Sequence, residues 1–460
     1  MKFTKLFGTV GAFLLLSVGA LAGTLKVGAT PVPHAEILEL IKPDLKKQGV
    51  DLKIVEFTDY VTPNLALSDK EIDANFFQHK PYLDKFVEER KLNLVSLGNV
   101  HVEPLGLYSK KIKSINDLKK GDTIAVVSLS RGVIGEEFCN HEILIGVKRL
   151  EKMGFKVIFM PNSLKGIKYI EEHPEKRAKD LKEAFINPEI KGILSAIGGV
   201  DGYKIFPYLM EDDEFIKSVK ENPKLFTGYS DTTVHHLMFH RLGMQSFYGP
   251  AFLTDIAELD DEMLPYTLKY WNIYSGSPLN KITSSDVWYE ERKDFSEKSL
   301  GIPRISHKET KGFELLQGNE IFSGQLLGGC MESLYNVISG DRFNEQKEIC
   351  EKYKIFPSKD EWKGKILFIE TAEVKSSPEE YEKMLTALKE KGVFDVVNAI
   401  IVGKPMDETY YNEYKDILCK IVDNHELPIL YNINFGHAYP KCILPYGLKI
   451  EYNHSEREII

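Results

Sequence analysis

Apolar and polar positions switch between two periods along most of the chain, which predicts strands that alternate with helices. Residues 25–29 and 51–57 have strand-like character, whereas residues 34–47 carry apolar side chains at helical spacing. Residues 92–97 are also strand-like. Residues 119–128 combine a turn with a buried-type strand. Further apolar runs typical of strands lie at residues 155–160, 191–199, 365–370, 396–402 and 427–432. Repeated strand–helix alternation favours parallel sheets covered by helices, so we predict an α/β protein.

One apolar run ends abruptly at Gly228-Tyr229-Ser230, and a helical segment from Thr232 to Leu242 follows at once. A strand, a sharp turn and a helix can expose a serine hydroxyl above a helix N-terminus. Serine is also a favoured helix N-cap, so a capping role is the structural alternative for Ser230.

Two glycines, Gly198 and Gly199, end another predicted strand. Glycines at such a place let backbone amides approach a ligand, as an oxyanion hole requires, although a plain turn would also use them.

A carboxylate and an imidazole follow two further strands. Glu370 ends the buried run 365–370, where an unpaired carboxylate would be unfavourable. His437 follows Gly436 shortly after the run 427–432. Ser230, His437 and Glu370 therefore form a candidate nucleophile, base and orienting acid. A structural ion pair for Glu370 and a capping or core position for His437 remain the alternatives.

Composition narrows the function classes. The 460 residues allow two or three domains, and the formal net charge of −9 argues against a nucleic acid polymer as partner. The five cysteines lie far apart and form no CxxC pair, which disfavours a zinc site or a disulfide scaffold. We expect neither a metal nor a cofactor.

The first 22 residues resemble a targeting segment. Lys2 and Lys5 precede an apolar run that ends in Ala20-Leu21-Ala22, an A-x-A cleavage site. We predict a cleaved signal peptide, export to the periplasm or the outside, and no stable membrane span; an uncleaved anchor is the alternative.

The first quarter of the chain resembles the first lobe of NlpA-type methionine-binding lipoproteins. The resemblance is carried by the residues 57–60 (FTDY), 73–83 (DANFFQHKPYL) and 108–114 (YSKKIKS). It implies ligand contacts by Tyr60, Phe77 and His79; core positions for the aromatic residues and a surface position for the histidine are the alternative. The family's second lobe is absent after about residue 122, so we expect weak or no methionine binding.

Residues 118–460 resemble the serine peptidase family of LD-carboxypeptidases and microcin C self-immunity proteins. The resemblance implies an acyl-enzyme mechanism with Ser230, His437 and Glu370 as the triad. It also implies oxyanion contacts at Gly199 and the Asp231 amide, with Gly198 beside the substrate. Members often form homodimers and usually work in the cytoplasm, which is the alternative to export. The matching residues are 121–124 (GDTI), 196–199 (AIGG), 228–232 (GYSDT), 247–250 (FYGP), 326–329 (LLGG), 367–370 (LFIE), 402–404 (VGK) and 436–437 (GH).

The segment 285–290 (SDVWYE) resembles the loop of the immunity-type members. This implies that Trp288 stacks on a nucleotide, since an indole offers a flat apolar face; the alternative is a tryptophan that pins the segment to the core. The peptide-type small substrate would be a murein tetrapeptide or a microcin C-like peptidyl or aminoacyl nucleotide. A secreted methionine-binding protein with an inactive hydrolase module is the alternative function.

The two resemblances imply half of a periplasmic-binding-protein lobe fused to a two-subdomain α/β serine peptidase with a strand–elbow–helix nucleophile. Residues 114–128 fit both families, which suggests a fusion at a point of local similarity. The predicted parts are a signal peptide (1–22), a truncated solute-binding lobe (23–118), a peptidase subdomain with the nucleophile (119–255), a linker or insert (256–312) and a subdomain with the acid and the histidine (313–460).

Overall fold

The computed structural model describes residues 24–98, 100, 118–277 and 281–460. The chain divides into two compact units, Met1–Tyr108 and Ser109–Ile460, which are described separately. The predicted signal peptide lies outside the described residues. No helix among the described residues is long and apolar enough to cross a membrane.

The first unit is built on a small parallel sheet with the strand order β2-β1-β3. Its strands are β1 (Thr24–Ala29), β2 (Asp51–Glu56) and β3 (Ala74–Phe76), and its α-helices are α2 (Glu36–Lys47), α3 (Thr62–Ser68) and α4 (Lys80–Arg90). Val27 and Leu52 of adjacent strands pack with Leu38 of α2 in its core. The predicted strand at residues 92–97 is wrong: no described strand pairs with this segment, and Val95 and Leu97 are exposed.

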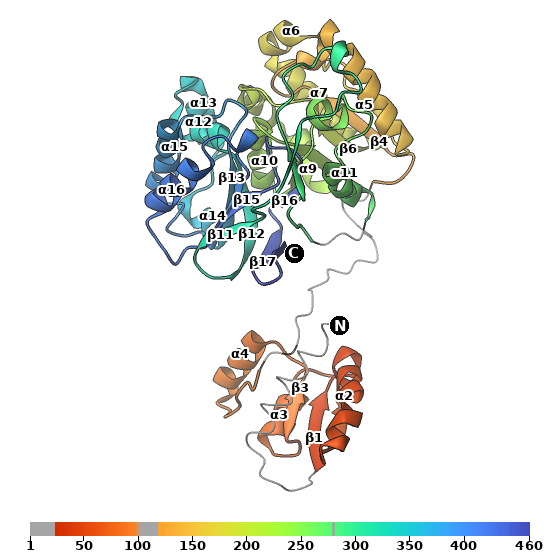
Figure 1. Ribbon diagram of the computed structural model, residues 1–460, viewed down its shortest axis with the longest axis vertical. Coiled ribbons are helices and arrows are strands. Elements are labelled where there is room, and N and C mark those ends of the chain that lie inside the picture. The colour runs from red at the N-terminus through yellow and green to blue at the C-terminus, as the bar shows by residue number, and fades with distance from the viewer. Residues whose placement is uncertain (1–23, 99, 101–117, 278–280) are drawn as a thin grey trace. The chain divides into compact units, whose positions relative to one another are not determined.

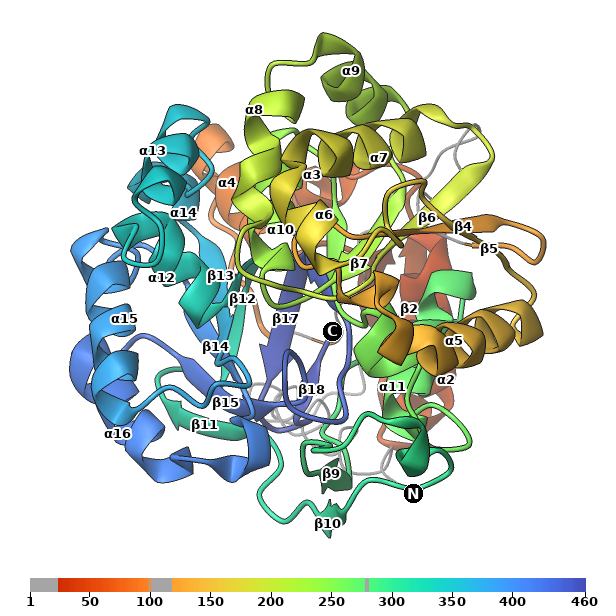
Figure 2. The same ribbon diagram turned by 90° about the horizontal axis from the view of Figure 1, so that it is seen from above.

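The second unit contains two large sheets (Figures 1 and 2). The first has the strand order β16-β8-β7-β6-β4-β5. Strands β4 to β8 are parallel, and the order turns back between β4 and β6. Ligands of such sheets bind at the carboxyl ends of the strands near this reversal. The strands are β4 (Thr123–Val127), β5 (Lys156–Phe159), β6 (Ile190–Ser195), β7 (Leu225–Gly228), β8 (Ser246–Tyr248) and β16 (Leu444–Tyr446). The helices are α5 (Asn140–Lys152), α6 (Ile167–Glu172), α7 (Pro174–Ile186), α8 (Phe206–Leu209), α9 (Asp213–Glu221), α10 (Thr232–Arg241) and α11 (Pro265–Trp271).

The second sheet has the order β11-β15-β14-β13-β12-β17-β18. Its four central strands are parallel, and antiparallel strands extend both edges. The strands are β11 (Glu314–Gln317), β12 (Ile321–Cys330), β13 (Lys365–Glu370), β14 (Ala399–Gly403), β15 (Ile429–Ile433), β17 (Lys449–Asn453) and β18 (Glu458–Ile459). The helices are α12 (Met331–Ser339), α13 (Asn344–Lys352), α14 (Lys359–Trp362), α15 (Pro378–Glu390) and α16 (Tyr411–Val422); α15 and α16 lie side by side outside the sheet (Figures 1 and 2).

The two sheets exchange a strand near the end of the chain. After β15 of the second sheet, the chain crosses to pair β16 antiparallel with β8 of the first sheet, and then returns as β17. One continuous hydrophobic core includes residues from both sheets. The predicted split into subdomains at residues 119–255 and 313–460 did not anticipate this exchange, and those boundaries stay a prediction.

The segment between the two subdomains contains α11 and a short hairpin of β9 (Val287–Tyr289) and β10 (Ser306–Lys308) (Figure 2). Buried ion pairs hold it: Glu258 contacts Arg292 at 2.6 Å and Arg304 at 2.5 Å, and all three side chains are at most 6% exposed. Both guanidinium groups thus depend on one carboxylate.

We expect Glu258→Gln to lower the free energy of unfolding of the second unit by about 3–5 kcal/mol, because two buried guanidinium groups lose their counter-charge. Urea-induced unfolding measures this loss. The control is Glu262→Gln, which removes an exposed ion pair with Lys152 and should lower the free energy of unfolding by about 1 kcal/mol or less. Equal losses in the two variants would contradict the structural role of Glu258.

Candidate active site

Ser230 lies at a sharp turn between β7 and α10. Its φ of +64° is in the left-handed region, which a non-glycine residue adopts only when the surrounding structure imposes it. The N-cap position of α10 is Asp231, and its side chain makes no capping hydrogen bond. Ser230 is therefore not the N-cap of this helix. The serine is half-buried at the carboxyl end of a parallel strand.

Glu370 and His437 are in direct contact. Glu370 is buried at the end of β13, and its Oε2 accepts hydrogen bonds from His437 Nδ1 at 2.8 Å and from the His437 backbone amide at 3.1 Å. A Cβ atom on Gly436 would lie 2.3 Å from the Glu370 carboxyl carbon, so glycine is required for this close approach. The carboxylate thereby fixes both the ring and the backbone of the histidine.

Tyr248 connects this pair to the serine. Its hydroxyl donates to Glu370 Oε1 at 2.6 Å and accepts a hydrogen bond from the Ser230 amide at 3.2 Å. The Tyr229 ring meets the His437 ring edge-on, with 4.9 Å between centroids. Tyr248 therefore links the backbone of the Ser230 turn to the Glu370–His437 pair.

Gly198 faces the nucleophile turn. A Cβ atom at this position would lie 2.7 Å from Ser230 Oγ and 3.3 Å from the Asp231 amide nitrogen. A side chain would fill the space beside the hydroxyl and this amide, so Gly198 leaves room for a substrate atom. This geometry matches what an oxyanion hole at the Asp231 amide needs.

Gly199 lies close to Ser130, a residue that the sequence analysis did not single out. With φ near +155°, its Cβ atom would lie 2.3 Å from Ser130 Oγ. Ser130 Oγ donates to Asp231 Oδ2 at 2.7 Å and accepts from the amides of Val200 and Asp201 at 3.0 and 3.1 Å. Ser130 thus ties the glycine loop to the nucleophile turn at the reversal of strand order.

Arg177, also missed, supports this network. It is fully buried on α7 and pairs with Asp201 at 2.8 Å. Burial raises the pKa of the Asp231 carboxyl, while hydrogen bonds from Ser130 and the Gly202 amide oppose the rise. The one available signal for Ser130 was the segment 128–131 (SLSR), whose polar positions directly follow β4, the strand beside the reversal.

Glu373 occupies the other nitrogen of the histidine. His437 Nε2 lies 3.0 Å from Glu373 Oε2 in an ion pair. Burial acts to lower the pKa of His437, but the carboxylates of Glu370 and Glu373 outweigh it and raise the pKa to about 10. Contact with the imidazolium lowers the pKa of Glu373 to about 2. The sequence analysis did not single out Glu373.

A buried cation joins the nucleophile turn to the histidine loop. Lys441 Nζ lies 4.1 Å from the ring centroids of both Tyr229 and Tyr439, and it pairs with Asp255 at 2.9 Å. The Arg304 guanidinium covers the Tyr439 ring at 3.8 Å. These cation–π contacts connect the site to the ion pairs of the insert.

Trp288 lies on β9 and is half-buried. Its ring stacks on His307 of β10 with 4.2 Å between centroids, and Lys404 Nζ lies 5.1 Å from its ring centroid. The neighbouring Tyr289 pairs with Tyr439, two residues after His437. One face of the indole is therefore already covered by protein, and the insert reaches the histidine loop through its backbone.

Cys330 joins Glu370 and His437 in a buried group of described residues whose metal-binding atoms lie within 4.8 Å of one another. Both Glu370 oxygens already accept hydrogen bonds, and Cys330 Sγ donates to Glu332 at 3.2 Å. We therefore assign no metal to this group.

The predicted ligand residues of the first unit are only partly assembled. The rings of Tyr60 and Phe77 stack with 6.2 Å between centroids; Tyr60 is exposed and Phe77 is buried. His79 is exposed at the start of α4. This arrangement suits the core and surface alternative for Phe77 and His79 as well as the ligand-binding one.

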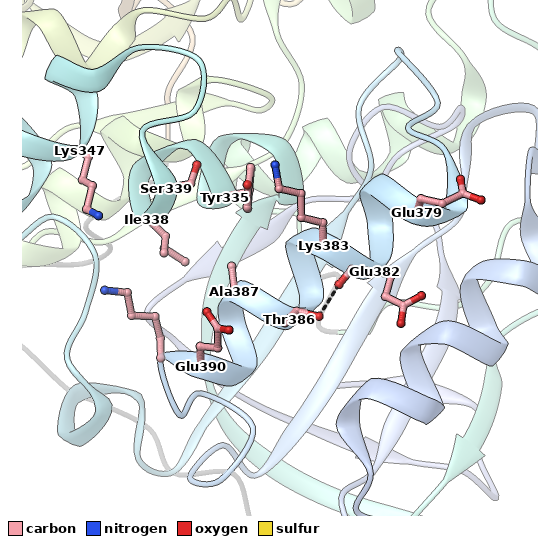
Figure 3. A pocket seen from close by; sticks show the side chains of 11 residues that line it. Tyr335, Ile338, Ser339, Lys347, Glu379, Glu382, Lys383, Thr386, Ala387 and Glu390 are labelled. Atoms are coloured by element: carbon pink, nitrogen blue, oxygen red, sulfur yellow. Dashed lines mark hydrogen bonds between the residues drawn. The ribbon is translucent and has the colours of Figure 1, made fainter.

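A separate groove lies along α12, α13 and α15 (Figure 3). Tyr335, Lys383 and Glu379 line it, and Lys383 pairs with Asp341 at 2.6 Å. None of the predicted site residues lines this groove, so it is not part of the candidate site.

Comparison with known families assigns the second unit. The family model of the LD-carboxypeptidase N-terminal domain matches residues 124–249, and that of the C-terminal domain matches residues 323–452, together more than half of the chain. The chain belongs to the LD-carboxypeptidase family. The model of NlpA lipoprotein matches residues 25–129, which overlaps the start of the LD-carboxypeptidase match.

Solved and curated relatives agree with this assignment. An MccF-like protein from Streptococcus pneumoniae, solved in complex with AMP, is 49% identical with a TM-score of 0.72 over 74% of this chain and 98% of its own. The microcin C7 self-immunity protein MccF of Escherichia coli is 26% identical over 74% of this chain and 93% of its own. One structure of MccF, with aspartyl sulfamoyl adenosine, has a TM-score of 0.61 and 25% identity over 75% of this chain and 96% of its own.

The first unit has lipoprotein relatives. The membrane lipoprotein TpN32 of Treponema pallidum is 46% identical over 25% of this chain and 46% of its own length. The chain spans about half the length of the first such relatives that it matches.

We expect Tyr248→Phe to slow covalent labelling of Ser230, the candidate nucleophile, by about 10- to 100-fold, because a hydrogen bond to a charged group contributes about 1.5–3 kcal/mol. The rate at which a fluorophosphonate labels Ser230 measures the effect. Tyr274→Phe is the matched control, since Tyr274 is equally buried but its hydroxyl donates to Thr227. A Tyr248→Phe rate equal to the control rate would contradict the bridging role.

Proposed function

We propose that the second unit is a serine hydrolase of the carboxypeptidase or amidohydrolase type that works through an acyl-enzyme. Ser230 is the nucleophile, His437 the base and Glu370 the acid that orients it. The observation that carries this proposal is the 2.8 Å contact of Glu370 with His437, linked through Tyr248 to the Ser230 amide.

The geometry supports a sequence of proton transfers. Glu370 accepts a hydrogen bond from Nδ1–H of His437 and stays ionised, which fixes the tautomer in which Nε2 accepts the Ser230 hydroxyl proton during attack on the scissile carbonyl. The Asp231 amide and the backbone at Gly198 and Gly199 stabilise the oxyanion. His437 then protonates the leaving group, and water attacks the acyl-enzyme with the same imidazole as base.

The substrate that we favour is an aminoacyl or peptidyl nucleotide. The MccF-like relative was solved with AMP, and MccF with aspartyl sulfamoyl adenosine. The half-buried Trp288 offers the flat surface on which a purine can stack, provided that His307 yields one face or the purine uses the other. A murein tetrapeptide, cut before its terminal D-alanine, is the second substrate class, because the family models are those of LD-carboxypeptidases.

Export is the localisation that we infer, from the signal-like residues 1–22 and from the lipoprotein relatives of the first unit. In this proposal the first unit is a partial solute-binding lobe joined by fusion to the hydrolase, and a homodimer is its oligomeric form. Of the two substrate classes, the murein tetrapeptide is reachable after export, whereas an intracellular nucleotide conjugate goes with the alternative of a cytoplasmic enzyme. A secreted methionine-binding protein with an inactive hydrolase module is the alternative function.

Ser230→Ala should reduce hydrolysis by at least about 10⁴-fold, because it removes the attacking atom. Chromatography measures the release of aspartate from an aspartyl-AMP analogue and the release of D-alanine from a murein tetrapeptide. An unchanged melting temperature shows that the variant folds. The neighbouring Ser333→Ala, which removes a hydroxyl that donates to the Ser230 carbonyl at 3.4 Å, should lose far less activity. Parental rates in Ser230→Ala would end the hydrolase proposal.

Trp288→Ala should raise KM for the nucleotide substrate by about 10- to 100-fold and leave KM for the murein tetrapeptide nearly unchanged, since stacking contributes about 1–3 kcal/mol per base. Steady-state kinetics on both substrates measure the difference. Trp271→Phe, in a fully buried position, is the control for general loss of packing. Equal effects on both substrates would show that Trp288 only pins the insert.

A further inference from the structure

The imidazole nitrogen that the proposed reaction needs is already engaged. His437 Nε2 is paired with Glu373 at 3.0 Å, while Nδ1 is held by Glu370 at 2.8 Å. Attack by Ser230 requires Nε2 to accept the hydroxyl proton. Glu373 must therefore leave this nitrogen before the reaction can begin.

The loop that carries Glu373 is fixed, whereas the side chain itself is accessible. Buried Glu332 of α12 accepts hydrogen bonds from the Ala372 amide at 3.0 Å and from the Ser376 hydroxyl at 2.8 Å. Between these two anchors, the Glu373 side chain is 55% exposed. Its carboxylate can rotate away from the histidine without any movement of the loop.

The charges around His437 make this movement unfavourable unless another cation is supplied. Carboxylates outnumber cations here, and a Glu373 carboxylate turned away from the imidazolium loses its closest positive charge. Arg342 is exposed and follows α12. Its positive charge acts to lower the pKa values of Glu373 and Asp231, but less than their other contacts do. The titratable and charged groups that face His437 and its partners are Glu370, Glu373, Tyr229, Tyr248, Cys330, Glu332, Arg342 and Lys441, whose ammonium group is already paired with Asp255.

We infer that Glu373 binds an ammonium group of the substrate, which replaces the His437 imidazolium as the cation paired with this carboxylate. The inference rests on the proposed function, since it assumes a substrate carbonyl at Ser230. The α-ammonium group of an aminoacyl substrate is two bonds from such a carbonyl carbon. A substrate placed for attack thus brings its cation to the region between Ser230 and His437.

The exchange also prepares the base. When Glu373 moves to the ammonium group, His437 loses one of the two carboxylates that favour its charged form, and Nε2–H releases its proton to solvent. The neutral nitrogen can then accept the Ser230 proton. A substrate that lacks the ammonium group leaves Glu373 on the histidine. Glu373 therefore makes the enzyme prefer an aminoacyl nucleotide with a free α-amine over a peptidyl nucleotide or a murein tetrapeptide, in which this nitrogen is acylated.

Calorimetry on the full chain with Ser230→Ala, which blocks turnover, tests this inference. The probes are aspartyl sulfamoyl adenosine and its N-acetyl derivative at pH 6.5, where an α-amino group is protonated. We expect the free amine to bind at least about tenfold more tightly than the acetylated compound. Titrations in buffers of different ionisation enthalpy should show that only the free amine releases a proton on binding.

Adding Glu373→Gln should abolish both the preference and the proton release, whereas adding Glu379→Gln should preserve them. Glu379 is an exposed glutamate on α15 that lines the separate groove (Figure 3), so it matches the change in charge. The inference is overturned if the preference survives Glu373→Gln, if the parent binds both compounds equally, or if it binds neither. The proposed function fails separately, through absent hydrolysis and absent fluorophosphonate labelling of Ser230.

Discussion

The contact between Glu370 and His437 is the constraint on which the second unit depends. Glu370 ends a strand of the second sheet, and His437 lies on the segment that leaves this sheet to add a strand to the first. Because a buried carboxylate needs a partner, the pair fixes where that crossing segment runs. Tyr248 comes from the first sheet and donates to the same carboxylate, so the serine turn and the histidine loop share one anchor.

Much of this architecture was accessible from the sequence, because local periodicity determines which residues a strand or helix can bury. The strand 365–370 appears with the predicted bounds, and the nucleophile turn lies between a strand and a helix as expected. The strand predicted at residues 92–97 is wrong for a related reason. Alternation describes a residue pattern, whereas a strand also needs a neighbour to pair with, and no described strand supplies one.

The supporting residues of the site were not accessible in the same way. Ser130 lies 101 positions from Asp231, and Tyr248 lies 122 positions from Glu370, so only the folded chain brings them together. Glu373 was passed over because an acidic residue after a strand is ordinary in a soluble protein. Its role becomes visible only through the nitrogen that it contacts. The residue pattern likewise does not reveal which sheet β16 joins, since a short antiparallel edge strand fits either sheet.

The strand exchange near the C-terminus has a consequence for how this protein is made. His437, β16, β17 and β18 all belong to the last 24 residues of the 460, and they complete both sheets. A ribosome-bound chain that lacks this segment has the serine turn and the acidic strand, but neither the imidazole nor the edge strand beside Tyr248. The proposed hydrolytic site is therefore assembled only after residues 437–459 have been added, which keeps a shorter nascent chain inert.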